Sequence, residues 1–144
     1  MADGERLRRF APWVILLAIA AVVAAGRWWP APAPAPIWVD CPSLAAGCQA
    51  RLGDATVTLG ASGAIKVLSP FEVWLRGVEA REVQASFTME GMDMGFNRYT
   101  LRPDGQGGYR ARVTLPVCVT GRRDWILTLT IDGQQMAVPF VTEL

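Results

Sequence analysis

Apolar and polar residues alternate in short runs along most of the chain after residue 54. In the run Glu82–Met89, every second residue from Val83 onward is apolar. An alternation with a period of two puts one set of side chains on each face of a β-strand. The pattern predicts eight strands: Ala55–Leu59, Ala64–Leu68, Phe71–Arg76, Glu82–Met89, Arg98–Arg102, Tyr109–Leu115, Trp125–Asp132 and Met136–Val141.

Turn-forming residues separate these runs, as in Gly60–Gly63 and Pro103–Gly105. Asp132-Gly133, between two alternating runs, is a strong signal for a β-hairpin. No helical pattern lies between the predicted strands. Short strands with one apolar face favour an antiparallel arrangement of two sheets. We therefore expect residues 37–144 to form an all-β domain, an antiparallel β-sandwich.

The N-terminal segment has a different pattern, because residues 1–9 are polar and no charge occurs between Phe10 and Gly26. A helix over residues 10–29 would be about 30 Å long, which matches the hydrocarbon core of a bilayer. Three arginines before the helix favour a cytoplasmic N-terminus. The sequence thus predicts a cytoplasmic segment 1–9 and a transmembrane helix 10–29 that acts as a signal anchor. A cleaved signal peptide is the alternative, and both interpretations export the rest of the chain.

Residues 30–36 alternate proline and alanine, which favours an extended linker of about 22 Å.

The composition of residues 37–144 narrows the possible functions of the predicted β-domain. Residues 37–144 carry ten basic and eleven acidic residues, so nothing in the net charge indicates nucleic-acid binding. The chain contains no histidine, which excludes a Ser-His-Asp triad and a Cys-His pair. Because no other constellation supports catalysis, we expect that the protein is not an enzyme.

The chain contains three cysteines, Cys41, Cys48 and Cys118. In an oxidising compartment we expect one disulfide and one leftover cysteine. Cys41–Cys48 is the simplest pair, although spacing alone leaves Cys41–Cys118 and Cys48–Cys118 open. We predict that Cys41 and Cys48 are bonded and that Cys118 is reduced. A free Cys118 would be either a small buried residue or a soft metal ligand.

The most distinctive motif is Met89-Glu-Gly-Met92-Asp-Met94-Gly95. Thioether sulfur is a soft, neutral ligand that suits Cu(I). If the segment is extended, Met92 and Met94 point to the same side. Met89 continues the apolar face of a predicted strand and is expected in the core, as is Met136. Met92 and Met94 are the first candidate metal ligands, and Met89 and Cys118 are the candidate third and fourth ligands.

These features together resemble the YtkA-like and FixH-like exported domains of bacteria. The likeness covers roughly residues 55–141, and Met92-Asp-Met94-Gly95 is its most specific part; the strand segments Pro70–Leu75, Gly108–Val113 and Asp124–Leu129 are its generic part. The resemblance implies an immunoglobulin-like sandwich in the periplasm, attached to the inner membrane. It also suggests a role in copper handling or in the assembly of a respiratory haem-copper oxidase.

Two hypotheses about function follow. In the first, a membrane-anchored periplasmic domain binds Cu(I) through Met92 and Met94 and assists a copper-handling protein or a respiratory oxidase. In the second, the domain binds no metal and is an interaction or structural subunit of a membrane complex. The exposed methionines would then form an adaptable contact surface.

Overall fold

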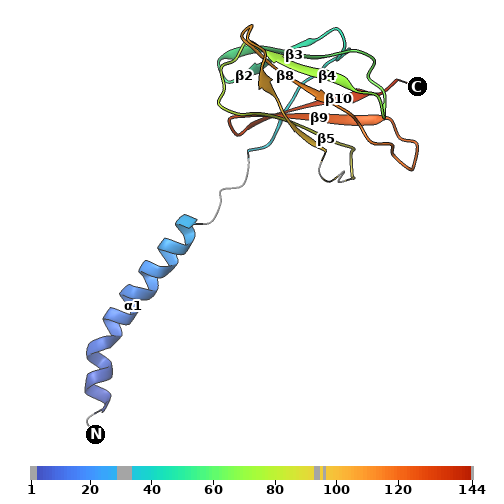
Figure 1. Cartoon of the computed structure of the whole chain (residues 1–144). Coiled ribbons are helices and arrows are strands. Elements are labelled where there is room, and N and C mark those ends of the chain that lie inside the picture. Colours follow the sequence, from blue (N-terminus) through green and yellow to red (C-terminus); the bar gives the residue numbers. More distant parts are fainter. Residues whose placement is uncertain (1–2, 29–33, 93–94, 96, 144) are drawn as a thin grey trace. The chain divides into compact units, whose positions relative to one another are not determined.

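The computed structural model describes residues 3–28, 34–92, 95 and 97–143, and the chain divides into two units, Met1–Ala33 and Pro34–Leu144 (Figure 1). The first unit contains the helix α1 (Asp3–Trp28). The second contains all ten strands of the described chain. Every residue of the hydrophobic core lies between Val39 and Phe140, so the second unit has a complete core of its own.

The helix α1 carries large apolar side chains that are exposed, from Trp13 to Trp28. Arg27 lies in its last turn, and Pro12 lies inside it. Within the part of the chain that the structure describes, no helix combines the length and the apolar character needed to cross a membrane. The transmembrane helix predicted over residues 10–29 is therefore not found.

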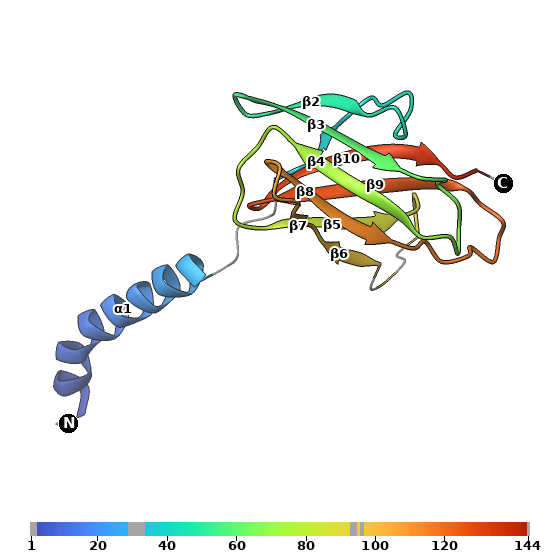
Figure 2. The same cartoon turned by 45° about the horizontal axis from the view of Figure 1, so that its top comes forward.

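The second unit is built from two five-stranded sheets, which Figure 2 shows as two facing layers. One sheet has the order β1-β10-β9-β5-β6 and the other the order β2-β3-β4-β8-β7. Only the β1–β10 pair is parallel among the strand pairs of the described chain. The strands are β1 (Ile37–Trp38), β2 (Cys48–Leu52), β3 (Ala55–Ser62), β4 (Phe71–Arg76), β5 (Val83–Thr88), β6 (Arg98–Thr100), β7 (Arg102–Pro103), β8 (Gly108–Val113), β9 (Asp124–Ile131) and β10 (Gln134–Val141).

The core lies between the two sheets. Side chains alternate along each strand, and the apolar ones point inward. β4 and β5 alternate regularly between buried and partly buried or exposed residues. Phe87 makes edge-to-face contacts with Phe71, Tyr99 and Phe140, with ring centroids 6.0–6.2 Å apart. Trp125 and Met136 are fully buried, which confirms the core position predicted for Met136. The all-β prediction for this unit is thus confirmed at the level of two packed sheets.

The predicted strand Ala64–Leu68 is wrong, because only Val67 pairs there, in an isolated bridge with Leu115. Gly63 and Leu68 have φ angles of +96° and +56°, which interrupt an extended backbone at both ends. Ile65 is nevertheless buried in the core. The alternation therefore reports burial at this segment without strand pairing.

The predicted strand Arg98–Arg102 is divided between the two sheets. Its first part, β6, pairs with β5, and its last part, β7, pairs with β8. Leu101 lies between them, and its N–H donates to the carbonyl of Val83 at 2.8 Å. The chain thus changes sheets at Leu101. Two further strands, β1 and β2, have no counterpart among the strands predicted from the sequence.

The Asp132-Gly133 hairpin between β9 and β10 is confirmed. Both residues have positive φ angles, +45° and +89°, as a two-residue type I′ turn requires. The carboxylate of Asp132 accepts hydrogen bonds from the backbone N–H groups of Arg81 and Glu82. The aspartate therefore also holds the start of β5 against the hairpin.

The disulfide prediction is confirmed. Cys41 and Cys48 are bonded, with Cα atoms 5.6 Å apart, and Cys118 is a free, buried cysteine. The bond joins the segment after β1, in one sheet, to the start of β2, in the other.

Candidate metal site

The methionine motif begins with a tight turn after β5. The N–H of Met92 donates to the carbonyl of Met89 at 3.0 Å, and the two residues form an isolated bridge. Gly91, at the third position of this turn, has a φ of +72°, which favours glycine there. The motif is therefore a turn up to Met92, and the expected extended arrangement of Met92 and Met94 lies partly outside the described residues.

The two methionines of this turn differ in exposure. Met89 is 2% exposed and belongs to the core, whereas Met92 is partly buried and packs against the core from outside. The core position of Met89 agrees with the sequence, in which Met89 continues the apolar face of the predicted strand Glu82–Met89. Met94, the other first candidate ligand, lies outside the described residues.

Cys118 lies in the segment between β8 and β9 and is 6% exposed. Its sulfur is 3.0 Å from the hydroxyl oxygen of Thr120. Hydrogen bonds from the Thr120 hydroxyl and then from the Thr120 backbone hold the pKa of the Cys118 thiol below its ordinary value, and Arg122 lowers this pKa further. The lowered pKa favours the thiolate, which is the form that binds soft metals.

Arg122 connects the Cys118 segment to the methionine turn. Its Nη1 donates to the backbone carbonyl of Glu90 at 3.0 Å. The same guanidinium forms a bidentate ion pair with Asp124, which raises the pKa of Arg122 and lowers the pKa of Asp124. Because Glu90 lies inside the turn, this contact keeps the turn beside the segment that carries Cys118.

A pocket of about 680 Å³ lies next to the turn. The indole N–H of Trp125 is buried and has no hydrogen-bond partner among the described residues. This pocket was not predicted, although Ile126 and Val141 are apolar residues at outward-facing positions and could have indicated it. The residues that line the pocket are Trp38, Met89, Glu90, Gly91, Asp124, Trp125, Ile126, Pro139, Phe140 and Val141.

The structure thus brings together part of the candidate ligand set. Met89 and Met92 are adjacent, and Cys118 lies in the neighbouring segment that Arg122 joins to their turn. Among the described residues, no group of three or more cysteines and carboxylates is placed to hold a metal ion.

Comparisons with known proteins give no match among family models, curated proteins or solved structures. The likeness to YtkA-like and FixH-like domains stays a prediction.

Proposed function

We propose that the domain binds Cu(I) at this end through Met92 and Met94, with Met89 and Cys118 as further candidate ligands. In this proposal the protein serves copper handling or the assembly of a respiratory oxidase. The observation that supports it is the hydrogen bond from Arg122 to Glu90, which holds the methionine turn beside the Cys118 segment. A set of thioethers with one thiolate suits Cu(I) better than harder metal ions.

The candidate ligands differ in how binding should depend on pH. A thioether has no proton to lose, so Met92 and Met94 would remain ligands in acid. Cys118 must lose its proton before it binds, and its lowered pKa reduces the cost of that step at neutral pH. If Cys118 takes part, affinity should fall as the pH decreases through the pKa of this thiol.

The test is a Cu(I) titration of residues 34–144 in the presence of a competing chelator. We expect Met92→Ala/Met94→Ala to lower the affinity at least about tenfold, because two soft ligands are lost. Met136→Leu is the matched control, because Met136 is fully buried in the core and should leave the affinity unchanged. Equal, weak uptake by the wild type and the double variant would contradict copper binding.

The pocket beside the turn favours a second candidate function, that of a metal-free interaction domain. Trp38 and Val141 line this pocket and are 62% and 63% exposed. Met92, partly buried at the neighbouring turn, would add an adaptable apolar contact. Equal, weak copper uptake by the wild type and by Met92→Ala/Met94→Ala would favour the interaction domain over the copper-binding domain.

We also propose that the two-sheet unit is an immunoglobulin-like sandwich of the YtkA-like or FixH-like kind. The two facing sheets, between which the chain crosses four times from β1 to β10, support this proposal. An experimental structure of residues 34–144 with sheets that differ from the orders β1-β10-β9-β5-β6 and β2-β3-β4-β8-β7 would contradict it.

For location, we propose that the domain lies in the periplasm and that α1 attaches it to the inner membrane. The disulfide Cys41–Cys48 supports an oxidising compartment. The exposed apolar side chains of α1 support contact with lipid.

A reporter fused after Leu144 tests this location. A reporter that is active only outside the cytoplasm should be active there, because the predicted orientation has the N-terminus inside. A reporter active only in the cytoplasm should be silent at the same position. The reverse pattern would overturn the proposed location.

A further inference from the structure

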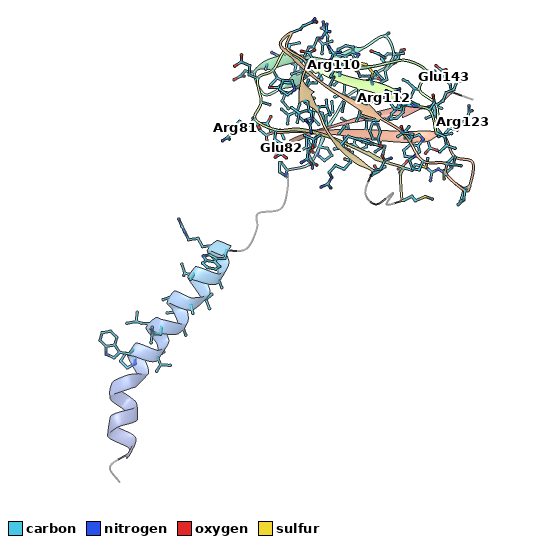
Figure 3. The ribbon with its side chains drawn as sticks, in the orientation of Figure 1. Arg81, Glu82, Arg110, Arg112, Arg123 and Glu143 are labelled. Carbon is cyan, nitrogen blue, oxygen red and sulfur yellow. A yellow bond between two sulfur atoms is a disulfide. The ribbon has the colours of Figure 1, made fainter. Side chains whose placement is uncertain are left out.

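The outer face of the sheet β2-β3-β4-β8-β7 is strongly basic. Its five strands contain five arginines and a single acidic residue, Glu72. The strand register puts these residues on one face, since Arg102 lies opposite Arg110 and Glu72 lies opposite Arg112. Figure 3 shows Arg110 and Arg112 on this sheet. The arginines, all exposed, are Arg51, Arg76, Arg102, Arg110 and Arg112.

Most of this positive charge is not neutralised. Arg110 pairs with Glu72 at 3.7 Å and with Asp104 at 3.3 Å. In the described part of the chain, the other four arginines of this face form no ion pair. The near-neutral net charge of residues 37–144 therefore hides an uneven distribution. The strands of the opposite sheet carry only two charged residues, Asp124 and Arg98.

Trp74 lies within the basic face. It is half-buried and lies against two glycines, because a Cβ atom on Gly60 would be 2.5 Å from its ring and one on Gly47 would be 3.0 Å away. The guanidinium carbon of Arg76 is 5.5 Å from the centre of the ring. Arginine together with an amphipathic indole is typical of surfaces that contact the headgroup region of a membrane.

We propose that this basic face docks on an anionic phospholipid surface. The choice of lipid as the occupant rests on the proposed attachment of α1 to a membrane, whereas the copper site plays no part in it. The eight residues between α1 and β1 reach at most about 28 Å, so an attached helix would keep the domain close to the bilayer. Two linked contacts with one membrane then reinforce each other, because the second one forms at a high effective concentration.

The test uses metal-free residues 34–144, which have a complete core, and vesicles of phosphatidylcholine alone or mixed with phosphatidylglycerol. We expect co-sedimentation with the anionic vesicles only, and loss of binding as salt is added. Arg76→Gln/Arg112→Gln should weaken the partition by about 30-fold, since each basic residue near an anionic surface contributes about fivefold. Arg51→Gln/Arg102→Gln leaves Trp74 and both ion pairs of Arg110 intact. It should weaken the partition onto anionic vesicles by the same factor.

Arg81→Gln/Arg123→Gln is the matched control. It removes the same charge from two loops at opposite ends of the domain, as Figure 3 shows, and should retain most of the binding. An equal loss in this control, or no binding to anionic vesicles, would overturn the proposal. Capture on immobilised polyglutamate without vesicle binding would also overturn it and indicate an acidic protein partner. If the full chain binds neutral vesicles while residues 34–144 bind no vesicles, that result would support attachment by α1 and refute docking by the basic face.

Discussion

Phe87→Ala should lower the free energy of unfolding of residues 34–144 by about 3–5 kcal/mol. Phe87 is 1% exposed, and its ring contacts three other aromatic rings at edge-to-face geometry. Truncation removes buried apolar surface and leaves a cavity that rigid strands fill poorly. This loss is a large fraction of the roughly 5–15 kcal/mol that typically stabilises a domain. Urea denaturation followed by tryptophan fluorescence measures it.

Phe87→Leu provides the comparison, because it keeps most of the buried volume and should cost roughly half as much. A loss below about 1 kcal/mol for the alanine variant would mean that Phe87 is not a central packing residue. The position also matters for the candidate site. Phe87 lies two residues before Met89, and its N–H donates to the carbonyl of Asn97 at 3.0 Å. The core therefore holds the chain on both sides of the methionine motif.

Strands with a strict alternation were predictable from the sequence because burial on one face is a local property. β4 agrees with its prediction at both ends, and β5 differs by one residue at each end. β1 was not predictable, because two residues show no period and their pairing depends on β10, which is far away in the sequence. β2 differs, because Cys48, Ala50 and Leu52 alternate with the exposed Gln49 and Arg51, so its period was visible in the sequence and was overlooked.

The candidate site was predictable in its residue types but only partly in its arrangement. A thioether motif and a leftover cysteine are visible in the sequence. Their proximity is not, because it depends on the contact between Arg122 and Glu90, two residues without a recognisable motif. The basic face escaped prediction for the same reason. Arg76 and Arg110 become neighbours through the pairing of β4 with β8, and a net charge summed along the chain conceals this.

Gly77→Ala should cost about 3–4 kcal/mol of unfolding free energy, from two separate causes. The first is the backbone of Gly77, whose φ of +86° lies in the left-handed region that disfavours a side chain. The second is space, because a Cβ atom would lie 2.8 Å from the carbonyl oxygen of Thr56 and 3.5 Å from the Cα of Val57. These are backbone atoms of β3, so a change of side-chain rotamer gives no relief.

Gly105→Ala separates the two causes. Gly105 has a similar φ of +77°, but a Cβ atom there would meet nothing within 4 Å. Its variant should therefore lose only the conformational part, about 1–2 kcal/mol. Urea denaturation of both variants gives the steric part as the difference between them. Equal losses would mean that β3 moves away from residue 77 at no cost, which would contradict the rigid contact between the end of β4 and the strand beside it.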